Sequence, residues 1–202
     1  VEWDFSSMAL RLLYALEKVN PPTGDLYDLG IPDKATARPI IKKYIQVLLN
    51  DEDNRFKSSG LKLKSIGMTR TDLHELVLKR HPIIEPHLNT DIGLQLQFTE
   101  SEIAFRVMRK MMHEHKVAVL PVHDSFLVRL GYEKHLQQEM ADAFETVTGQ
   151  KPVMKRDFPQ THPTFKLPAD KDGIVQVSTN PFKIVDSAYF KYVSTNPNAI
   201  LD

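Results

Sequence analysis

Apolar residues recur at helical spacing in five segments of the chain, which predicts five amphipathic helices. Their approximate ranges are Ser6–Val19, Thr36–Leu49, Thr69–Arg80, Glu100–His115 and Tyr132–Val147. The stripe of Ile41, Tyr44, Ile45 and Leu48 marks the buried side of the second helix. Between the first two helices, residues 20–33 are rich in Pro and Gly and read as a loop.

Three segments have the pattern of strands. They are the first five residues, a hairpin made of residues 117–124 and 126–129, and a run near 152–158. Ser125 begins the hairpin turn, and His123 and Asp124 lie at its tip. The order of strand, helices, hairpin, helix and strand predicts an α+β fold, with helices packed on one face of a small antiparallel sheet.

From residue 159 the chain changes character, because prolines become frequent and helical periodicity is lost. The five residues Val177–Pro181 recur as Val193–Pro197, sixteen positions later. Two copies are too few for a solenoid. We therefore expect a compact domain over residues 1–158 and an extended tail over 159–202 that packs on this domain or on a partner.

The amino-acid composition excludes several classes of protein. Among 202 residues there is no Cys, which excludes disulfides, a thiol nucleophile and a zinc ribbon and favours a reducing compartment. The apolar runs are far shorter than the roughly 20 residues that cross a bilayer, and no signal peptide is visible. We expect a chain without a membrane partner, in the cytoplasm or associated with a virion or nucleoid.

The charges are balanced overall but not locally. The chain has 26 Lys+Arg and 26 Asp+Glu, a balance that is mildly unfavourable for binding phosphates. Between Ala35 and Arg80, however, ten Lys/Arg face five Asp/Glu. This segment is either the electrostatic footprint of a nucleic-acid site or the solvated face of a helix.

Two carboxylates are the first candidates for chemistry. Asp4 ends a predicted strand and Asp124 lies at a predicted hairpin tip, where one small sheet could bring them together. Two adjacent carboxylates repel each other unless a divalent cation lies between them. On the second helix, Arg38 and Lys42 are one turn apart and could hold a triphosphate. The pattern indicates metal-assisted phosphoryl transfer.

Four segments, in this order, resemble motifs of family A DNA polymerases and the related single-subunit phage-type RNA polymerases. Residues 4–15 look like motif A, with an Arg seven positions after the Asp, and residues 38–42 match the R-x-x-x-K opening of motif B. Residues 97–103 are similar to the Gln-Gly-Thr-Ala-Ala-Asp-Ile stretch before motif C. Residues 122–126 match the motif C hairpin, with a Ser closer to the RNA polymerase version.

The resemblance implies a palm-like sheet with fingers-like helices and a template-directed nucleotidyltransferase. Its partners would be a primer-template and nucleoside triphosphates. Its implied residues are the Mg²⁺ or Mn²⁺ ligands Asp4 and Asp124, His123 at the primer end, Arg38 and Lys42 on the triphosphate, and Arg11 and Gln97 on the nucleic acid. The alternative is that these residues have structural roles only: Asp4 caps the first helix, His123 is a turn residue and Gln97 is a surface residue.

Three positions depart from the DNA polymerase pattern. Gln46 and Asn50 occupy nucleotide-facing positions where the family has an aromatic ring or Met and then a Tyr. Base stacking at the insertion site is therefore in question. Ala9 stands where DNA polymerases carry a bulky Glu that excludes the ribose hydroxyl, and the RNA polymerases are also small there. We expect weak discrimination between ribose and deoxyribose.

No thumb or upstream palm fits before Val1, and the first strand needs partners, so we expect a piece of a longer polymerase, an assembly with other polypeptides or a relic. Two other function classes stay open. One is a non-catalytic nucleic-acid-binding or assembly module derived from such a polymerase. The other is an HD-type phosphohydrolase, which needs the His-Asp pair on a helix together with further His and Asp ligands.

Overall fold

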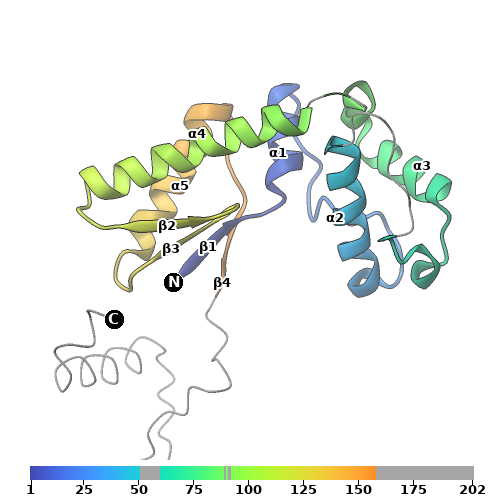
Figure 1. Ribbon diagram of the computed structural model, residues 1–202, viewed down its shortest axis with the longest axis horizontal. Coiled ribbons are helices and arrows are strands. Elements are labelled where there is room, and N and C mark those ends of the chain that lie inside the picture. The colour runs from blue at the N-terminus through green and yellow to red at the C-terminus, as the bar shows by residue number, and fades with distance from the viewer. Residues whose placement is uncertain (51–59, 89, 91, 158–202) are drawn as a thin grey trace, which may run out of the picture. The chain divides into compact units, whose positions relative to one another are not determined.

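The computed structural model describes residues 1–50, 60–88, 90 and 92–157 (Figure 1). The chain divides into two units, residues 1–158 and 159–202, and the description concerns the first of them. The expected tail with its two copies of Val-Ser-Thr-Asn-Pro lies outside the described residues. Within the described part, no helix is long and apolar enough to cross a membrane.

The first unit contains four strands, five α-helices and two 3-10 helices over the described residues. In chain order they are β1 (Glu2–Phe5), α1 (Met8–Leu16), α2 (Lys34–Asn50), η2 (Leu63–Ile66), α3 (Arg70–Arg80), η3 (Pro82–His87), α4 (Ile92–His113), β2 (Val119–Val122), β3 (Ser125–Val128), α5 (Glu133–Thr148) and β4 (Met154–Asp157). The predicted α+β class with a small antiparallel sheet is confirmed.

The sheet has the order β2-β3-β1-β4, and each neighbouring pair is antiparallel. The first strand therefore pairs with the hairpin on one side and with the last strand on the other. In this register Asp4 lies opposite Ser125 on β3 and opposite Lys155 on β4. Because side chains alternate along a strand, these three belong to one face of the sheet.

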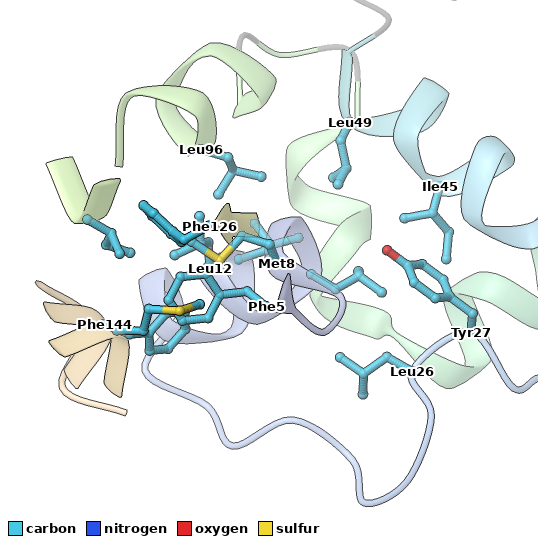
Figure 2. Close-up of a cluster of buried hydrophobic side chains, with 14 of the residues drawn as sticks. Phe5, Met8, Leu12, Leu26, Tyr27, Ile45, Leu49, Leu96, Phe126 and Phe144 are labelled. Atoms are coloured by element: carbon cyan, nitrogen blue, oxygen red, sulfur yellow. The ribbon is translucent and has the colours of Figure 1, made fainter. Parts of the chain in front are cut away.

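The other face of the sheet is the base of the hydrophobic core. The ring of Phe5 packs edge-on against Phe126 of β3 at 6.2 Å between centroids and against Phe144 of α5 at 5.5 Å. Figure 2 shows these rings beside Leu12 of α1, with the α2 side chains continuing the cluster around Ile45. Burying such large apolar side chains is the main stabilising contribution, at about 1.5–3 kcal/mol each.

The face that carries Asp4 is open to solvent. Leu120 and Val122 of β2 belong to it by register and are 65% and 46% exposed. Ser125 is buried there, and its hydroxyl donates to the carboxylate of Glu2 at 2.6 Å. One face of the sheet therefore packs against helices, and the other carries the carboxylates of Glu2 and Asp4 and is partly exposed to solvent.

The helix boundaries correct the sequence prediction at three places. Helix α1 ends at Leu16 rather than Val19, because Lys18 adopts a left-handed φ of 55°. Helix α4 begins at Ile92, eight residues before the predicted start at Glu100. Helix α2 begins at Lys34 rather than Thr36, so Pro39 is its sixth residue and cannot donate to the carbonyl of Ala35.

The predicted start of the third helix at Thr69 is confirmed, since Thr69 is the N-cap of α3. The Thr69 hydroxyl accepts from the backbone N–H of Asp72 at 3.2 Å, and the Asp72 carboxylate accepts from the backbone N–H of Thr69 at 2.9 Å. This reciprocal capping box satisfies two amides that a helix start leaves without partners.

Candidate functional site

Strand pairing brings Asp4 and Asp124 together, although 120 residues separate them in the chain. The backbone N–H of Phe5 donates to the carbonyl of Asp124 at 2.9 Å. One residue earlier, Asp4 lies directly opposite Ser125. The backbones of Asp4 on β1 and Asp124 in the β2–β3 turn are therefore one register position apart.

The predicted tip residues His123 and Asp124 form the two-residue turn between β2 and β3, whereas Ser125, predicted to begin the turn, is the first residue of β3 because it pairs with Val122. His123 has a φ of 54°, in the left-handed region that tight hairpin turns require. His is one of the few residues other than glycine that adopts this region with some frequency. The turn leaves His123 exposed and Asp124 half-buried.

Asp4 lies among structural partners that the sequence analysis did not consider. Its Oδ2 lies 3.0 Å from Nζ of Lys155, and its side chain is 16% exposed. Asp4 does not cap α1, since the N-cap of that helix is Ser7. The structural alternative for Asp4 is therefore an ion pair across β1 and β4 rather than a helix cap.

A third carboxylate faces the hairpin turn from α4. Burial raises the pKa of Glu100 above its usual range, the charge of Asp124 raises it further, and His123 opposes the shift. This pattern places Glu100 within electrostatic reach of both turn residues. The sequence analysis missed Glu100, although it lies inside the 97–103 stretch that resembles the segment before motif C.

Arg38 lies against two residues from the loop between α1 and α2. Its Nε donates to Oδ2 of Asp25 at 2.6 Å, and its guanidinium lies 5.2 Å from the ring centroid of Tyr27. Tyr27 is 4% exposed, and burial raises its pKa to about 12. Arg38 lowers this pKa and Asp124 raises it. Tyr27 therefore lies within electrostatic reach of both Arg38 on α2 and Asp124 in the hairpin turn.

Neither Tyr27 nor Asp25 was a sequence candidate. Both come from a segment that reads only as a loop between two helices. Its folding is anchored by the burial of Leu26 and Tyr27 in the core. The only hint in the sequence was an apolar pair, Leu26 and Tyr27, within a stretch of turn residues.

The predicted basic face of α2 is present. Arg38, Lys42, Gln46 and Asn50 are all exposed and follow one another at four-residue spacing. At its end, Asn50 donates through Nδ2 to the Gln46 carbonyl at 2.7 Å and accepts from Gln97 Nε2 at 3.4 Å. The structure therefore brings the candidates Asn50 and Gln97 together across α2 and α4.

The crossing of α2 and α4 depends on Gly93. A Cβ at this position would lie 2.2 Å from Oδ1 of Asn50 and 2.8 Å from the backbone oxygen of Leu49. Real Cβ contacts are not this short, so glycine permits the close approach. Gly93 is a positioning residue that the sequence analysis did not single out.

The two α1 candidates are half-buried beside the core. Arg11 donates from Nε to the carbonyl of Ser6 at 2.9 Å, which ties α1 to the end of β1. Burial lowers the pKa of Arg11. Ala9, two residues earlier on the same helix, packs against the hydrophobic cluster. Arg11 thus has a structural contact in addition to its predicted contact with nucleic acid.

Within the described residues, one group of three possible metal-ligand side chains lies at a different location. Glu114, His115 and Glu139 place their ligand atoms within 4.8 Å of one another, between the end of α4 and α5. His115 Nε2 and Glu139 Oε1 are 2.8 Å apart, which is an ordinary hydrogen bond. This group is separate from Asp4 and Asp124.

Comparisons with known proteins do not decide the family. The chain matches no family model, no curated protein and no solved structure. The resemblance to family A polymerases therefore depends on the four motif segments and on how the fold arranges them.

Proposed function

We propose that the chain is a template-directed nucleotidyltransferase of the family A type, with a palm-like sheet and a divalent cation, Mg²⁺ or Mn²⁺, held by Asp4 and Asp124. The observation that carries this proposal is the pairing of β1 with the β2–β3 hairpin. It joins the ends of two distant motif segments through the 2.9 Å hydrogen bond from Phe5 to Asp124.

The electrostatics of the turn fit a cation. Burial raises the pKa of Glu100 and the negative charge of Asp124 raises it further, so these two carboxylates lie within electrostatic reach of each other. Carboxylate oxygens are the ligands that Mg²⁺ prefers, and Mg²⁺ leaves coordination positions for substrate phosphates. When bound, the cation would stabilise the negative charge that develops during phosphoryl transfer.

The basic face of α2 supplies the complementary charge. Arg38 and Lys42 project from adjacent turns, and Arg38 is oriented by Asp25 and by the ring of Tyr27. A guanidinium held in one direction can bind phosphate oxygens in a bidentate manner, whereas Lys42 acts as a point charge. In this account both residues bind the triphosphate of the incoming nucleotide.

The remaining candidates act on the nucleic acid. His123 is exposed at the tip of the turn and would contact the primer end beside the metal ligands. Gln97 and Asn50, joined at 3.4 Å, would line the nucleic-acid side of the α2–α4 crossing. Ala9 leaves space for a ribose hydroxyl, so this account includes incorporation of ribonucleotides.

One observation favours the second candidate function, a non-catalytic nucleic-acid-binding or assembly module. The ammonium of Lys155 lies 3.0 Å from Asp4 and compensates part of the charge that a cation would otherwise balance. Under this alternative Asp4 stabilises the sheet and the basic face of α2 binds phosphates without chemistry. The HD-type hydrolase has less support, because His123 and Asp124 lie in a hairpin turn rather than on a helix.

Primer extension tests the proposal. The full chain is incubated with a labelled primer-template, Mg²⁺ or Mn²⁺, and either ribo- or deoxynucleoside triphosphates. We expect template-dependent extension that Asp4→Asn and Asp124→Asn each reduce at least a hundredfold, whereas Asp142→Asn on α5 retains it. Equal extension by Asp124→Asn, or binding of primer-template with no extension under any condition, would overturn the enzyme and leave the binding module.

A further inference from the structure

Helix α4 carries an apolar stripe on its outer side. Leu94, Phe98, Phe105 and Met112 are 57–65% exposed, whereas Leu96, Ile103 and Val107 on the opposite side are buried in the core. From Leu94 to Met112 the stripe extends over 19 residues, or about 27 Å of helix. Four large apolar side chains aligned on the exposed side of one helix indicate an interaction surface.

The spacing of the stripe is that of a helix-pairing seam. Phe98, Phe105 and Met112 follow one another at seven-residue intervals. Leu94 precedes Phe98 by four residues, which is the d-to-a step of a heptad. A seam of this kind is buried by a second helix that runs alongside the first.

Two opposite charges beside the seam, those of Glu102 and Arg109, can pair between two copies of the helix. Glu102 and Arg109 are seven residues apart, so they lie on the same flank of the stripe, one on each side of Phe105 along the helix axis. If two copies of α4 run antiparallel with Phe105 at the two-fold axis, Glu102 of each copy comes level with the turn that carries Arg109 of the other. In a parallel pair, Glu102 of one copy and Arg109 of the other would be about 10 Å apart along the helix axis and would not pair.

The surface is also hollowed where a second helix would dock. A depression beside Phe105 is lined by Ser101, Glu102, Phe105, Arg106 and Arg109. Four of these, residues 102, 105, 106 and 109, have the i, i+3, i+4, i+7 relation of a hole in knobs-into-holes packing. An apolar side chain from an opposing helix can fill it.

We propose that the protein forms a two-fold symmetric dimer through antiparallel pairing of α4, with Phe105 at the axis and Glu102 paired to Arg109 of the second copy. The interface uses the outer side of the helix. Gln97 and Glu100 lie away from this flank, and Glu100 faces the hairpin turn instead. The dimer proposal therefore does not rest on the proposed nucleotidyl transfer, and the two proposals are tested separately.

Single cysteines test the geometry, because the chain contains no Cys of its own. With Phe105 at the axis, Phe105→Cys places two thiols within disulfide reach, and mild oxidation should link most of the protein. Phe98→Cys would place its thiols about 21 Å apart in the antiparallel pair and should not link. Linkage of both variants to the same extent, or of neither, would overturn the antiparallel arrangement.

Oligomeric state tests the energetics. Sedimentation velocity of the full chain at increasing concentration should show a monomer–dimer equilibrium that Phe105→Glu shifts at least tenfold toward monomer. Leu120→Glu, at an equally exposed position on the sheet, should leave it unchanged. Circular dichroism of each variant checks that the fold is retained. A native chain that stays monomeric, or a Phe105→Glu variant that dimerises as the native chain does, would overturn the proposal.

Charge reversal separates self-association from other occupants of the surface. Glu102→Arg and Arg109→Glu should each weaken the dimer, and the double variant should restore its strength because both ion pairs are re-formed in reverse. A double variant as weak as the single ones would contradict the pairing of Glu102 with Arg109.

Discussion

The ammonium of Lys155 lies 3.0 Å from the carboxylate of Asp4, across the β1–β4 pair. The same carboxylate is on the strand that hydrogen-bonds to Asp124. A proposed metal ligand thus has a cation of the protein's own beside it. If Asp4 binds a divalent cation as proposed, Lys155 weakens this binding, since a positive charge at this distance opposes the binding of a second one.

Replacing Lys155 by Met should strengthen cation binding. Because the Lys155 side chain is 55% exposed, its interaction with Asp4 is partly screened and is worth about 0.2–1 kcal/mol. We expect the dissociation constant for Mg²⁺ or Mn²⁺ to fall by up to about fivefold, measured by isothermal titration calorimetry. Lys151→Met, at an exposed position before β4, is the control and should leave it unchanged. Weaker binding by Lys155→Met would show that Lys155 supports the site instead.

The pKa of Glu100 reports on the charge of the turn. Burial and Asp124 raise it, so removing the charge in Asp124→Asn should lower it toward its usual value, as measured by NMR titration of the side-chain carboxyl. A saturating divalent cation should lower it in the native protein for the same reason. A Glu100 pKa that responds to neither change would place this carboxylate outside the proposed site.

The same shift has a consequence for stability. A carboxyl with a raised pKa binds its proton more tightly in the folded chain than in the unfolded chain. Its contribution to stability is therefore present below the unfolded value near 4.5 and is lost as the pH rises through the folded value. Asp124→Asn should flatten this part of the stability–pH profile in urea unfolding.

Gly93→Ala should destabilise the crossing of α2 and α4. The new methyl would meet the backbone oxygen of Leu49 at 2.8 Å, and backbone cannot move aside as a side chain can. Overpacking costs about 1–3 kcal/mol and outweighs the roughly 1 kcal/mol by which Ala favours a helix over Gly. Urea unfolding measures the difference, with Gln95→Ala at an exposed α4 position as the control. An unchanged or raised stability would mean that the two helices separate without cost.

Arg38→Ala should weaken triphosphate binding by about tenfold or more, in keeping with about 1.5–3 kcal/mol for a hydrogen bond to a charged group. Arg129 is a matched control, because it is also exposed and also stacks on a tyrosine, at 4.5 Å from the Tyr132 ring. Fluorescence titration with a labelled nucleotide measures both. Similar losses in Arg38→Ala and Arg129→Ala would indicate nonspecific attraction rather than a site on α2.

The sequence predicted the elements better than it predicted the surroundings of the site. The hairpin tip at His123 and Asp124 and the capping box at Thr69 follow from local chemistry, so a short stretch of sequence is sufficient to find them. Lys155 and Glu100 become neighbours of the acids only through strand register and helix packing. These are non-local, and no spacing along the chain encodes them.

The early start of α4 shows a second limit of prediction from the sequence. Residues 92–99 keep the helical period, with Ile92 and Leu96 buried. However, Leu94 and Phe98 are apolar and exposed, and Gly93 has no side chain, so the sequence does not separate an apolar side from a polar side. A helix that buries one side and presents apolar residues on the other lacks a clear amphipathic pattern. Tertiary contacts with α2 and α5 determine its length.

Cation binding at the two acids tests the central claim most directly. Mn²⁺ binding to the full chain is followed by electron paramagnetic resonance with and without a nucleoside triphosphate, for the native protein and for Asp4→Asn, Asp124→Asn and the control Asp142→Asn. The account predicts one site that the triphosphate strengthens and that either of the first two variants weakens at least tenfold. Mn²⁺ affinity that is the same in all four proteins would contradict it.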